Sequence, residues 1–88
     1  MNKFQKLYQA IIEEKKTDIS FKDFQYFIEH LGFDHRNTKG DHFIYHMNGI
    51  PDRICIQPKN GKAKDYQVKQ IRNIVTKYGL GDDNYDEL

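Results

Sequence analysis

The sequence predicts an α+β domain of two layers, in which helices pack on a three-stranded antiparallel sheet in the order α-α-β-β-β-α. Three segments place apolar residues at the three- and four-residue spacing of amphipathic helices. Between the second and third of these, residues 39–57 hold two short runs rich in aromatic and β-branched residues around an Asn-Gly-Ile-Pro-Asp turn, which is typical of a hairpin. This arrangement is the smallest that buries all three apolar stripes.

The first predicted helix spans residues 2–16. Its apolar stripe consists of Phe4, Leu7, Tyr8, Ile11 and Ile12. We expect this stripe to pack in the core, and the alternative is a helix that binds a partner. The second helix begins after Ser20, which the acid at Asp23 marks as an N-cap, and Gly32 is placed to end it.

A short first strand is predicted at residues 33–37, and the hairpin follows with a loop longer than two residues. Side chains alternate along a strand, so two sets of residues face opposite ways: His42, Ile44 and His46 on one side, and Phe43, Tyr45 and Met47 on the other. The second set is uniformly apolar and suits the core, which leaves the histidines outward. Ile44 could equally be the core residue.

A basic turn at residues 58–64 leads to the last helix, for which Asp65 is the expected N-cap and Gly79 the end. Its buried stripe is Val68, Ile71, Ile74, Val75 and Tyr78. The prediction is therefore one domain over residues 1–80, in which residues 1–16 are an extra helix, followed by an acidic, disordered tail at 81–88.

Length and composition narrow the class of protein. A chain of 88 residues forms one small domain, and a deep, enclosed active site is not expected. The single cysteine, Cys55, excludes an internal disulfide and favours a reducing cytoplasm. No apolar run approaches the roughly 20 residues of a membrane span. We expect no metal, no small-molecule cofactor and no membrane partner.

The net charge of +1 conceals an asymmetry. Four of the 13 acids lie near the end of the chain, and the remaining nine face 14 basic residues, a net charge of +5. Between Arg36 and Lys77 there are nine basic residues and three acids. This excess of basic residues in one part of the chain favours a polyanionic partner. The alternative is an ordinary solvated surface.

From the second helix onward, the order α-β-β-β-α is that of the double-stranded-RNA-binding fold. Over residues 19–80 the chain also resembles the HicA family of prokaryotic toxins, which cleave messenger RNA and pair with an antitoxin. The matching segments are Leu31-Gly32-Phe33, Arg36, Gly40-x-His42 before Ile44 and Tyr45, Ile54-Cys55-Ile56-Gln57-Pro58, Tyr66-Gln67-Val68-Lys69-Gln70-Ile71 and Tyr78-Gly79-Leu80.

The resemblance implies that His42 is the catalytic residue of an endoribonuclease that acts on mRNA in the cytoplasm and is held inactive by a HicB-like antitoxin. Asp41 departs from the family, which has serine at this position. A carboxylate beside His42 favours the imidazolium form but also repels an approaching phosphate. This departure puts activity at neutral pH in question.

The chemistry expected from the residues is metal-independent. The 2′-hydroxyl of RNA attacks phosphorus while His42 moves the proton and cations stabilise the developing charge. The candidate RNA-binding cations are Lys39, Arg53, Lys62, Lys64 and Lys69. Ile44 and His46, if outward, form a footprint for the antitoxin.

Two other functions remain open at this point. One is an RNA-binding module of the double-stranded-RNA-binding type that has lost catalysis, with Asp41 as the mark of the lost site. The other is a domain that binds only protein. The sequence leaves open the cleavage preference, the oligomeric state and the identity of the antitoxin.

Overall fold

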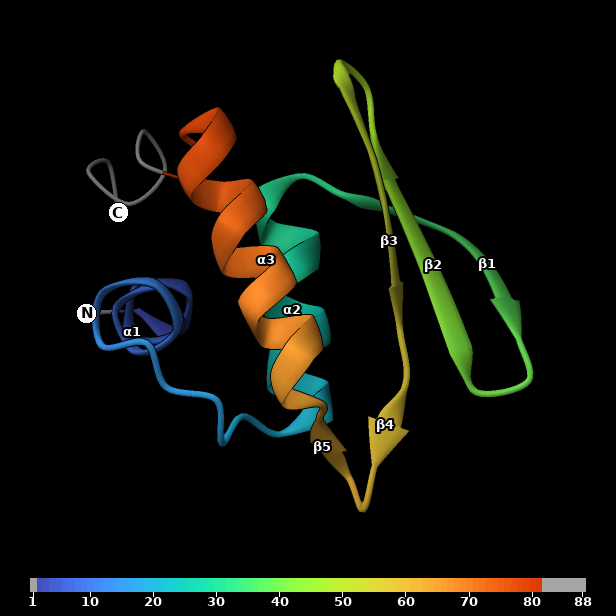
Figure 1. The fold of residues 1–88 in the computed structure, drawn as a ribbon, viewed down its shortest axis with the longest axis horizontal. Helices are drawn as coiled ribbons and strands as arrows, with labels where there is room; N and C mark the ends of the chain where they lie inside the picture. The colour runs from blue at the N-terminus through green and yellow to red at the C-terminus, as the bar shows by residue number, and fades with distance from the viewer. Residues whose placement is uncertain (1, 82–88) are drawn as a thin grey trace.

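A computed structural model describes residues 2–81 and confirms the predicted α+β class and the order of its main elements (Figure 1). The sheet is antiparallel and has the strand order β1-β2-β3, and a second, two-stranded sheet is formed by β4 and β5. The elements are α1 (Lys3–Tyr8), the π-helical turn η1 (Gln9–Glu13), α2 (Phe21–Leu31), β1 (Asp34–Lys39), β2 (His42–Met47), β3 (Ile50–Ile56), β4 (Pro58–Lys59), β5 (Lys62–Ala63) and α3 (Asp65–Tyr78).

Helices α2 and α3 lie between the sheet and α1 (Figure 1). The ring of Phe4 on α1 stacks on Phe27 of α2 with 5.4 Å between centroids, so the first stripe belongs to the core, as predicted. The first helix is not α-helical throughout. The Glu14 N–H donates to the Gln9 carbonyl at 2.8 Å, an i→i+5 bond that ends the segment in a π-helical turn.

The ends of α2 are those predicted. Ser20 Oγ accepts a hydrogen bond from the Asp23 N–H at 3.1 Å, which satisfies one of the free donors at the helix start. Gly32 ends the helix with φ of 113°, a left-handed conformation that costs glycine little. The chain therefore turns directly from α2 into β1.

The prediction of a long hairpin loop is wrong. Met47 pairs with Ile50, so Asn48 and Gly49 alone form the turn between β2 and β3. The Asn-Gly pair is the strongest short hairpin signal, and Gly49 adopts φ of 87°. Ile50, Pro51 and Asp52, which were assigned to the loop, instead lie in β3, where the strand register is irregular. Because β3 is an edge strand and Pro51 is exposed, the N–H group that proline lacks is not needed for a hydrogen bond within the sheet.

The core side of the hairpin is formed by Tyr45, Ile54 and Ile56, each with no exposed surface. The Tyr45 hydroxyl donates to Glu29 at 3.2 Å and accepts from Gln25 at 3.4 Å, both on α2. Burial raises the pKa of this hydroxyl above its ordinary value. Strand β2 is therefore fixed to α2 by an apolar ring whose polar end is satisfied.

The basic turn predicted at residues 58–64 contains an ordered hairpin, β4–β5. Asn60 and Gly61 have φ of 53° and 76°, the pair of positive values that a two-residue type I′ turn requires. Backbone bonds of 2.9 Å join this hairpin to the chain around the start of α2, from Ala63 N–H to the Ile19 carbonyl and from Phe21 N–H to the Gly61 carbonyl. The lysines of this segment therefore stand on a fixed backbone.

The start of α3 differs from the prediction by one residue. Lys64 is the N-cap, without a side-chain cap bond, and Asp65 is the first helical residue. At the other end, Gly79 is left-handed and the Leu80 N–H donates to the Val75 carbonyl at 3.1 Å, a Schellman-type closure.

Gly81 is the first residue of the predicted tail. A Cβ on Gly81 would lie 3.0 Å from Leu31 Cδ2 and 3.2 Å from Tyr8 Cε2, so Gly81 packs closely against the domain. The rest of the predicted tail, residues 82–88, lies outside the described residues. None of the helices within residues 2–81 has the length and apolar character that crossing a bilayer requires.

Candidate functional site

His42 lies at the start of β2, directly after a two-residue turn. Lys39 of β1 pairs with His42, so Gly40 and Asp41 form the turn, and Gly40 adopts φ of 64°. The spacing Gly40-x-His42 thus has a structural cause. The first residue of the two-residue turn adopts a left-handed conformation, which glycine does at little cost. The His42 side chain is half exposed, and Lys39 is beside it on the adjacent strand.

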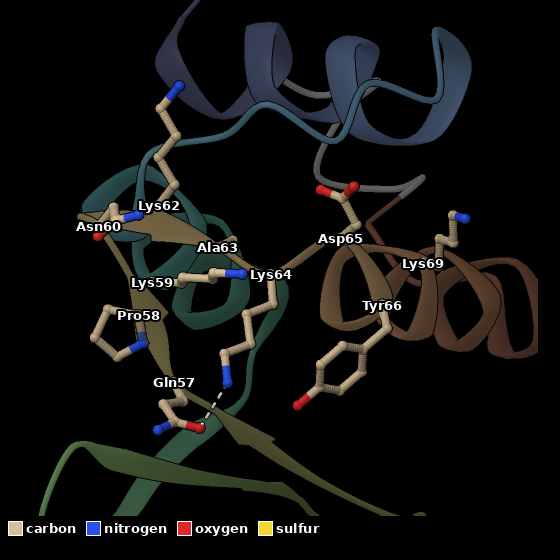
Figure 2. A pocket seen from close by; sticks show the side chains of 10 residues that line it. All are labelled: Gln57, Pro58, Lys59, Asn60, Lys62, Ala63, Lys64, Asp65, Tyr66 and Lys69. Carbon is tan, nitrogen blue, oxygen red and sulfur yellow. Dashed lines mark hydrogen bonds between the residues drawn. The ribbon is translucent and has the colours of Figure 1, made fainter.

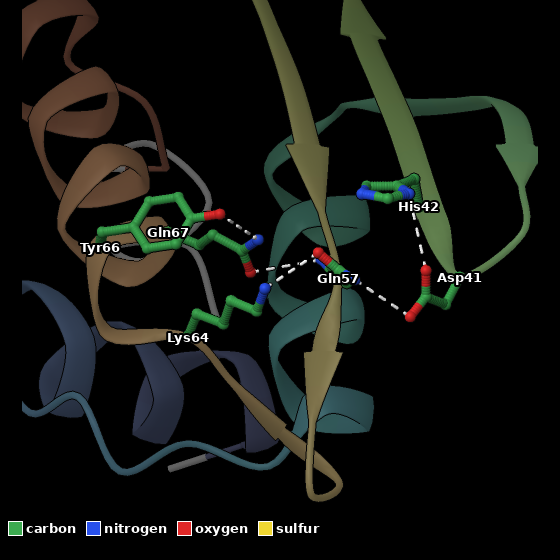
Figure 3. A network of polar contacts seen from close by, with 6 residues as sticks. All are labelled: Asp41, His42, Gln57, Lys64, Tyr66 and Gln67. Atoms are coloured by element: carbon green, nitrogen blue, oxygen red, sulfur yellow. Dashed lines mark hydrogen bonds and ion pairs between the residues drawn. The ribbon is translucent and has the colours of Figure 1, made fainter.

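Asp41 contacts one nitrogen of the His42 ring. Its Oδ1 lies 3.5 Å from His42 Nδ1 (Figure 3). Within residues 2–81, no group makes a hydrogen bond with the other ring nitrogen, Nε2. The carboxylate therefore biases the orientation of the ring and leaves Nε2 available to a substrate.

Asp41 is itself held by a chain of polar contacts that crosses to α3. Gln57 Nε2 donates to Asp41 Oδ2 at 3.1 Å, and Lys64 Nζ donates to Gln57 Oε1 at 2.9 Å. Figure 3 shows the two contacts as one line from the helix start to the β1–β2 turn. A cation at the N-terminus of α3 is thereby connected to the carboxylate beside His42.

The middle of this chain rests on a buried amide. Gln67 of α3 is 1% exposed and is the buried polar residue of the described core. In the amide orientation that satisfies both groups, it accepts from the Gln57 N–H at 3.1 Å and donates to the Gln57 carbonyl at 3.3 Å. Gln67 thus fixes the backbone of Gln57 and with it the direction of the side chain that reaches Asp41.

An open groove of about 1150 Å³ lies beside this chain, between the β4–β5 hairpin and the start of α3. Its walls carry most of the lysines of this region: Lys59, Lys62, Lys64 and Lys69, with Tyr66. Figure 2 shows Lys64 and Tyr66 projecting in the same direction, toward Gln57, and the ammonium group of Lys59 directed toward Lys64. The groove therefore combines cations with one aromatic ring.

Two of the predicted RNA-binding lysines point elsewhere. Lys62 Nζ lies 2.5 Å from Asp18, an ion pair that reduces its charge toward a ligand. Lys69 projects from the same side of α3 as Asp65, away from the Tyr66 ring (Figure 2). Of the three predicted lysines on this segment, Lys64 is the one directed toward the His42 region.

The remaining predicted residues occupy the sheet surface opposite the core. We call this surface the open face; its residues are Lys39, His42, Ile44, His46, Arg53 and Cys55. Arg53 and Cys55 are exposed, whereas Ile44 and His46 are half-buried. Of the two orientations left open for Ile44, the structure has the outward one, and its register partner Cys55 lies beside it.

The open face has two ends. His42 lies at one end with Lys39, and His46 lies about 13 Å away at ~3.3 Å per residue. Arg53 precedes Ile54, the partner of Tyr45, and therefore belongs to the His46 end. The structure thus brings Lys39 and Lys64 toward His42 but does not bring Arg53 there.

Sequence reasoning missed three residues of the site. Gln57, Lys59 and Tyr66 received no role, although Gln57 and Tyr66 lie in two of the segments quoted above for the resemblance to HicA toxins. The Asn60-Gly61 pair was the available signal for Lys59, because a hairpin turn there directs the flanking side chains in fixed ways. The bond between Gln57 and Asp41 joins residues 16 positions apart and has no local sequence signal.

In residues 2–81, no three His, Cys, Asp or Glu side chains are grouped so that they could hold a metal ion. Comparisons of the chain with protein-family models, with curated proteins and with solved structures give no match.

Proposed function

We propose that this protein is a toxin of the HicA type, an endoribonuclease that cleaves mRNA without a metal ion and uses His42 as its acid and base. The observation that carries the proposal is the environment of His42. The ring is half exposed, Asp41 engages Nδ1, and the polar chain through Gln57 ends at a lysine-lined groove. These are a proton carrier, a residue that orients it and cations for a phosphate.

The geometry supports the following reaction. His42 Nε2 takes the proton of a ribose 2′-hydroxyl, and the 2′-oxygen attacks the adjacent phosphorus. The bond from phosphorus to the 5′-oxygen then breaks, and this oxygen receives a proton from the imidazolium. The products are a 2′,3′-cyclic phosphate and a 5′-hydroxyl end.

Cations near His42 stabilise the charge that develops on the phosphoryl oxygens. Lys39 pairs with His42 across the turn, and Lys64 reaches the same region through Gln57. These two are the preferred candidates among the basic residues. One acid–base group contributes only about 10²–10⁴-fold to a rate, so we expect a slow enzyme. A slow nuclease is still toxic when every message in the cytoplasm is a substrate.

The proposed protein partner is a HicB-like antitoxin that covers the open face. Ile44 and His46 lie on the same side of β2 as His42 and remain partly accessible. An antitoxin bound to these residues would cover His42 as well, because all three side chains project from one face of one strand.

The test uses purified full-length protein in excess EDTA with RNA and DNA of the same sequence. We expect cleavage of RNA alone, with cyclic phosphate ends. We also expect His42→Ala to abolish both cleavage and the growth arrest that the native protein causes in cells. Cleavage by the His42→Ala protein at the native rate would remove His42 from this role.

One observation favours a second candidate, an RNA-binding module without catalysis. The 3.5 Å separation between Asp41 and His42 is longer than the 2.7–2.9 Å or so of a charge-assisted hydrogen bond, so the pair is loosely held. This candidate predicts RNA binding with no cleavage product under any condition. Any product made by the native chain rules it out.

A further inference from the structure

Tyr66 is the one large hydrophobic residue that is exposed within residues 2–81, with 62% of its surface accessible. Its neighbours along α3, Gln67 and Val68, are buried. The Tyr66 hydroxyl lies 3.4 Å from the side-chain amide of Gln67, so the polar end of the side chain is held while most of its surface stays accessible (Figure 3). The ring projects from the first turn of α3 beside Lys64, on the wall of the groove (Figure 2).

The cations around this ring are distributed unevenly. Lys64 projects parallel to Tyr66, and Lys59 is directed toward Lys64 from the opposite wall (Figure 2). Lys62 is paired with Asp18 at 2.5 Å, and Lys69 shares the far side of α3 with Asp65. The groove thus presents one aromatic ring with Lys64 and then Lys59 on the same side of it (Figure 2).

We infer that this groove is a subsite for single-stranded RNA, in which Tyr66 stacks on one unpaired base while Lys64 and Lys59 contact successive phosphates on one side of that base. An aromatic ring beside a row of cations suits a nucleotide strand, since every base has a stacking face and every linkage carries a charge. A paired base is already stacked on both sides within a duplex, so its face is closed to Tyr66. The inference specifies the substrate class and rests on the proposed function.

Hydrogen bonds also connect the subsite to the surroundings of His42. Lys64 Nζ donates to Gln57, and Gln57 donates to Asp41 beside His42. A phosphate that contacts Lys64 is therefore connected to the histidine through Gln57, which directly follows β3, and Asp41 of the β1–β2 turn. A base held by Tyr66 sets which linkage of the strand is presented to His42.

The experiment measures binding of a short single-stranded RNA by fluorescence anisotropy, in the full-length His42→Ala protein so that the probe stays intact. Tyr66→Ala is added to this chain. We expect about 5- to 140-fold weaker binding, the range that loss of one stacked base gives. Tyr66→Phe, which keeps the ring, recovers most of the affinity.

Four further measurements separate stacking on Tyr66 from contacts with phosphate. A strand of the same length without bases binds equally with or without Tyr66, and the salt dependence is unchanged by Tyr66→Ala because no phosphate contact is lost. Lys59→Gln lowers the salt slope by about 0.7. Lys77→Gln, which removes the same charge at the far end of α3, lowers it by less than half as much.

Three results would overturn the inference: binding of the intact strand within twofold after Tyr66→Ala, equal losses for the intact and baseless strands, or tighter binding of duplex than of single strands. Displacement of the strand by poly-glutamate at a tenth of its concentration would also overturn it, since an acidic protein would then be the better occupant.

This outcome is separable from that of the proposed function. A native chain that cleaves RNA but binds it independently of Tyr66 refutes the subsite alone. A native chain that binds through Tyr66 and makes no product refutes the nuclease alone.

Discussion

The two sides of the β2–β3 hairpin differ in what they do, although their residues alternate along the same strands. On the core side, Tyr45, Ile54 and Ile56 have no exposed surface. On the open face, His42 and Cys55 are exposed and Ile44 is half-buried. The core side therefore stabilises the hairpin. The side chains of the open face are less tightly packed, so they can bind a substrate or take part in a reaction.

The polar groups on the two sides differ in whether their hydrogen bonds are already made within the protein. The hydroxyl of Tyr45 donates to Glu29 and accepts from Gln25, so its proton is already used inside the domain. The chain that ends at His42 leaves one imidazole nitrogen without a contact in the described part of the molecule. The polar group on the core side has hydrogen-bond partners within the protein, whereas a ring nitrogen at the candidate site has none among the described residues.

The largest expected contrast between the faces is in stability. We predict that Ile54→Ala lowers the free energy of unfolding by about 2–5 kcal/mol, because the site is fully buried and a cavity remains. The matched substitution on the open face, Ile44→Ala, should cost about 1 kcal/mol, since only part of its surface is buried. Urea denaturation measures both, and equal losses would mean that the open face is also a packing face.

A smaller effect is expected from the polar end of the core side. Tyr45→Phe should cost about 1 kcal/mol at pH 7, the value of the lost hydrogen bonding. The native pKa of Tyr45 is raised, so its contribution is complete below the unfolded value of 10.0 and is lost as pH rises above it. The stability difference between the native and Tyr45→Phe proteins should therefore shrink at pH 10.5. A difference that grows with pH would contradict the direction of the shift.

The smallest stability effects are expected for charges on the open face. Lys39→Gln and Arg53→Gln should each change the free energy of unfolding by no more than about 0.5 kcal/mol. Their effects on cleavage should differ, because Lys39 pairs with His42 and Arg53 lies at the His46 end. We expect roughly tenfold slower cleavage for Lys39→Gln, which corresponds to one lost charge-assisted contact. Equal rates for the two proteins would show that position along the face is unimportant.

The fold was largely predictable because it depends on local periodicity. The apolar stripes of α2 and α3, the Ser20 cap and the glycine stops all follow from spacing within a few residues. The π-helical turn η1 was not predictable, because one extra residue per turn barely changes an apolar stripe. The β4–β5 hairpin was missed because strands of two residues are too short to show alternation.

The candidate site was predictable only in part. The outward direction of His42 follows from strand alternation once the apolar side is assigned to the core. The charge of Lys62 is visible in the sequence, but its pairing with Asp18 joins residues 44 positions apart. The role of Gln57 depends equally on tertiary contacts, with Asp41 on one side and Lys64 on the other. Residue type identified the candidates, and only the fold could select among them.

The most direct test compares the two histidines of β2, which share one strand and one face. Single-turnover cleavage of RNA in EDTA is measured for the native, His42→Ala and His46→Ala proteins. We predict that His42→Ala loses about 10²–10⁴-fold in rate and that His46→Ala stays within about threefold of native. An equal loss for both histidines, or a His42→Ala protein that cleaves at the native rate, would contradict the assignment of the chemistry to His42.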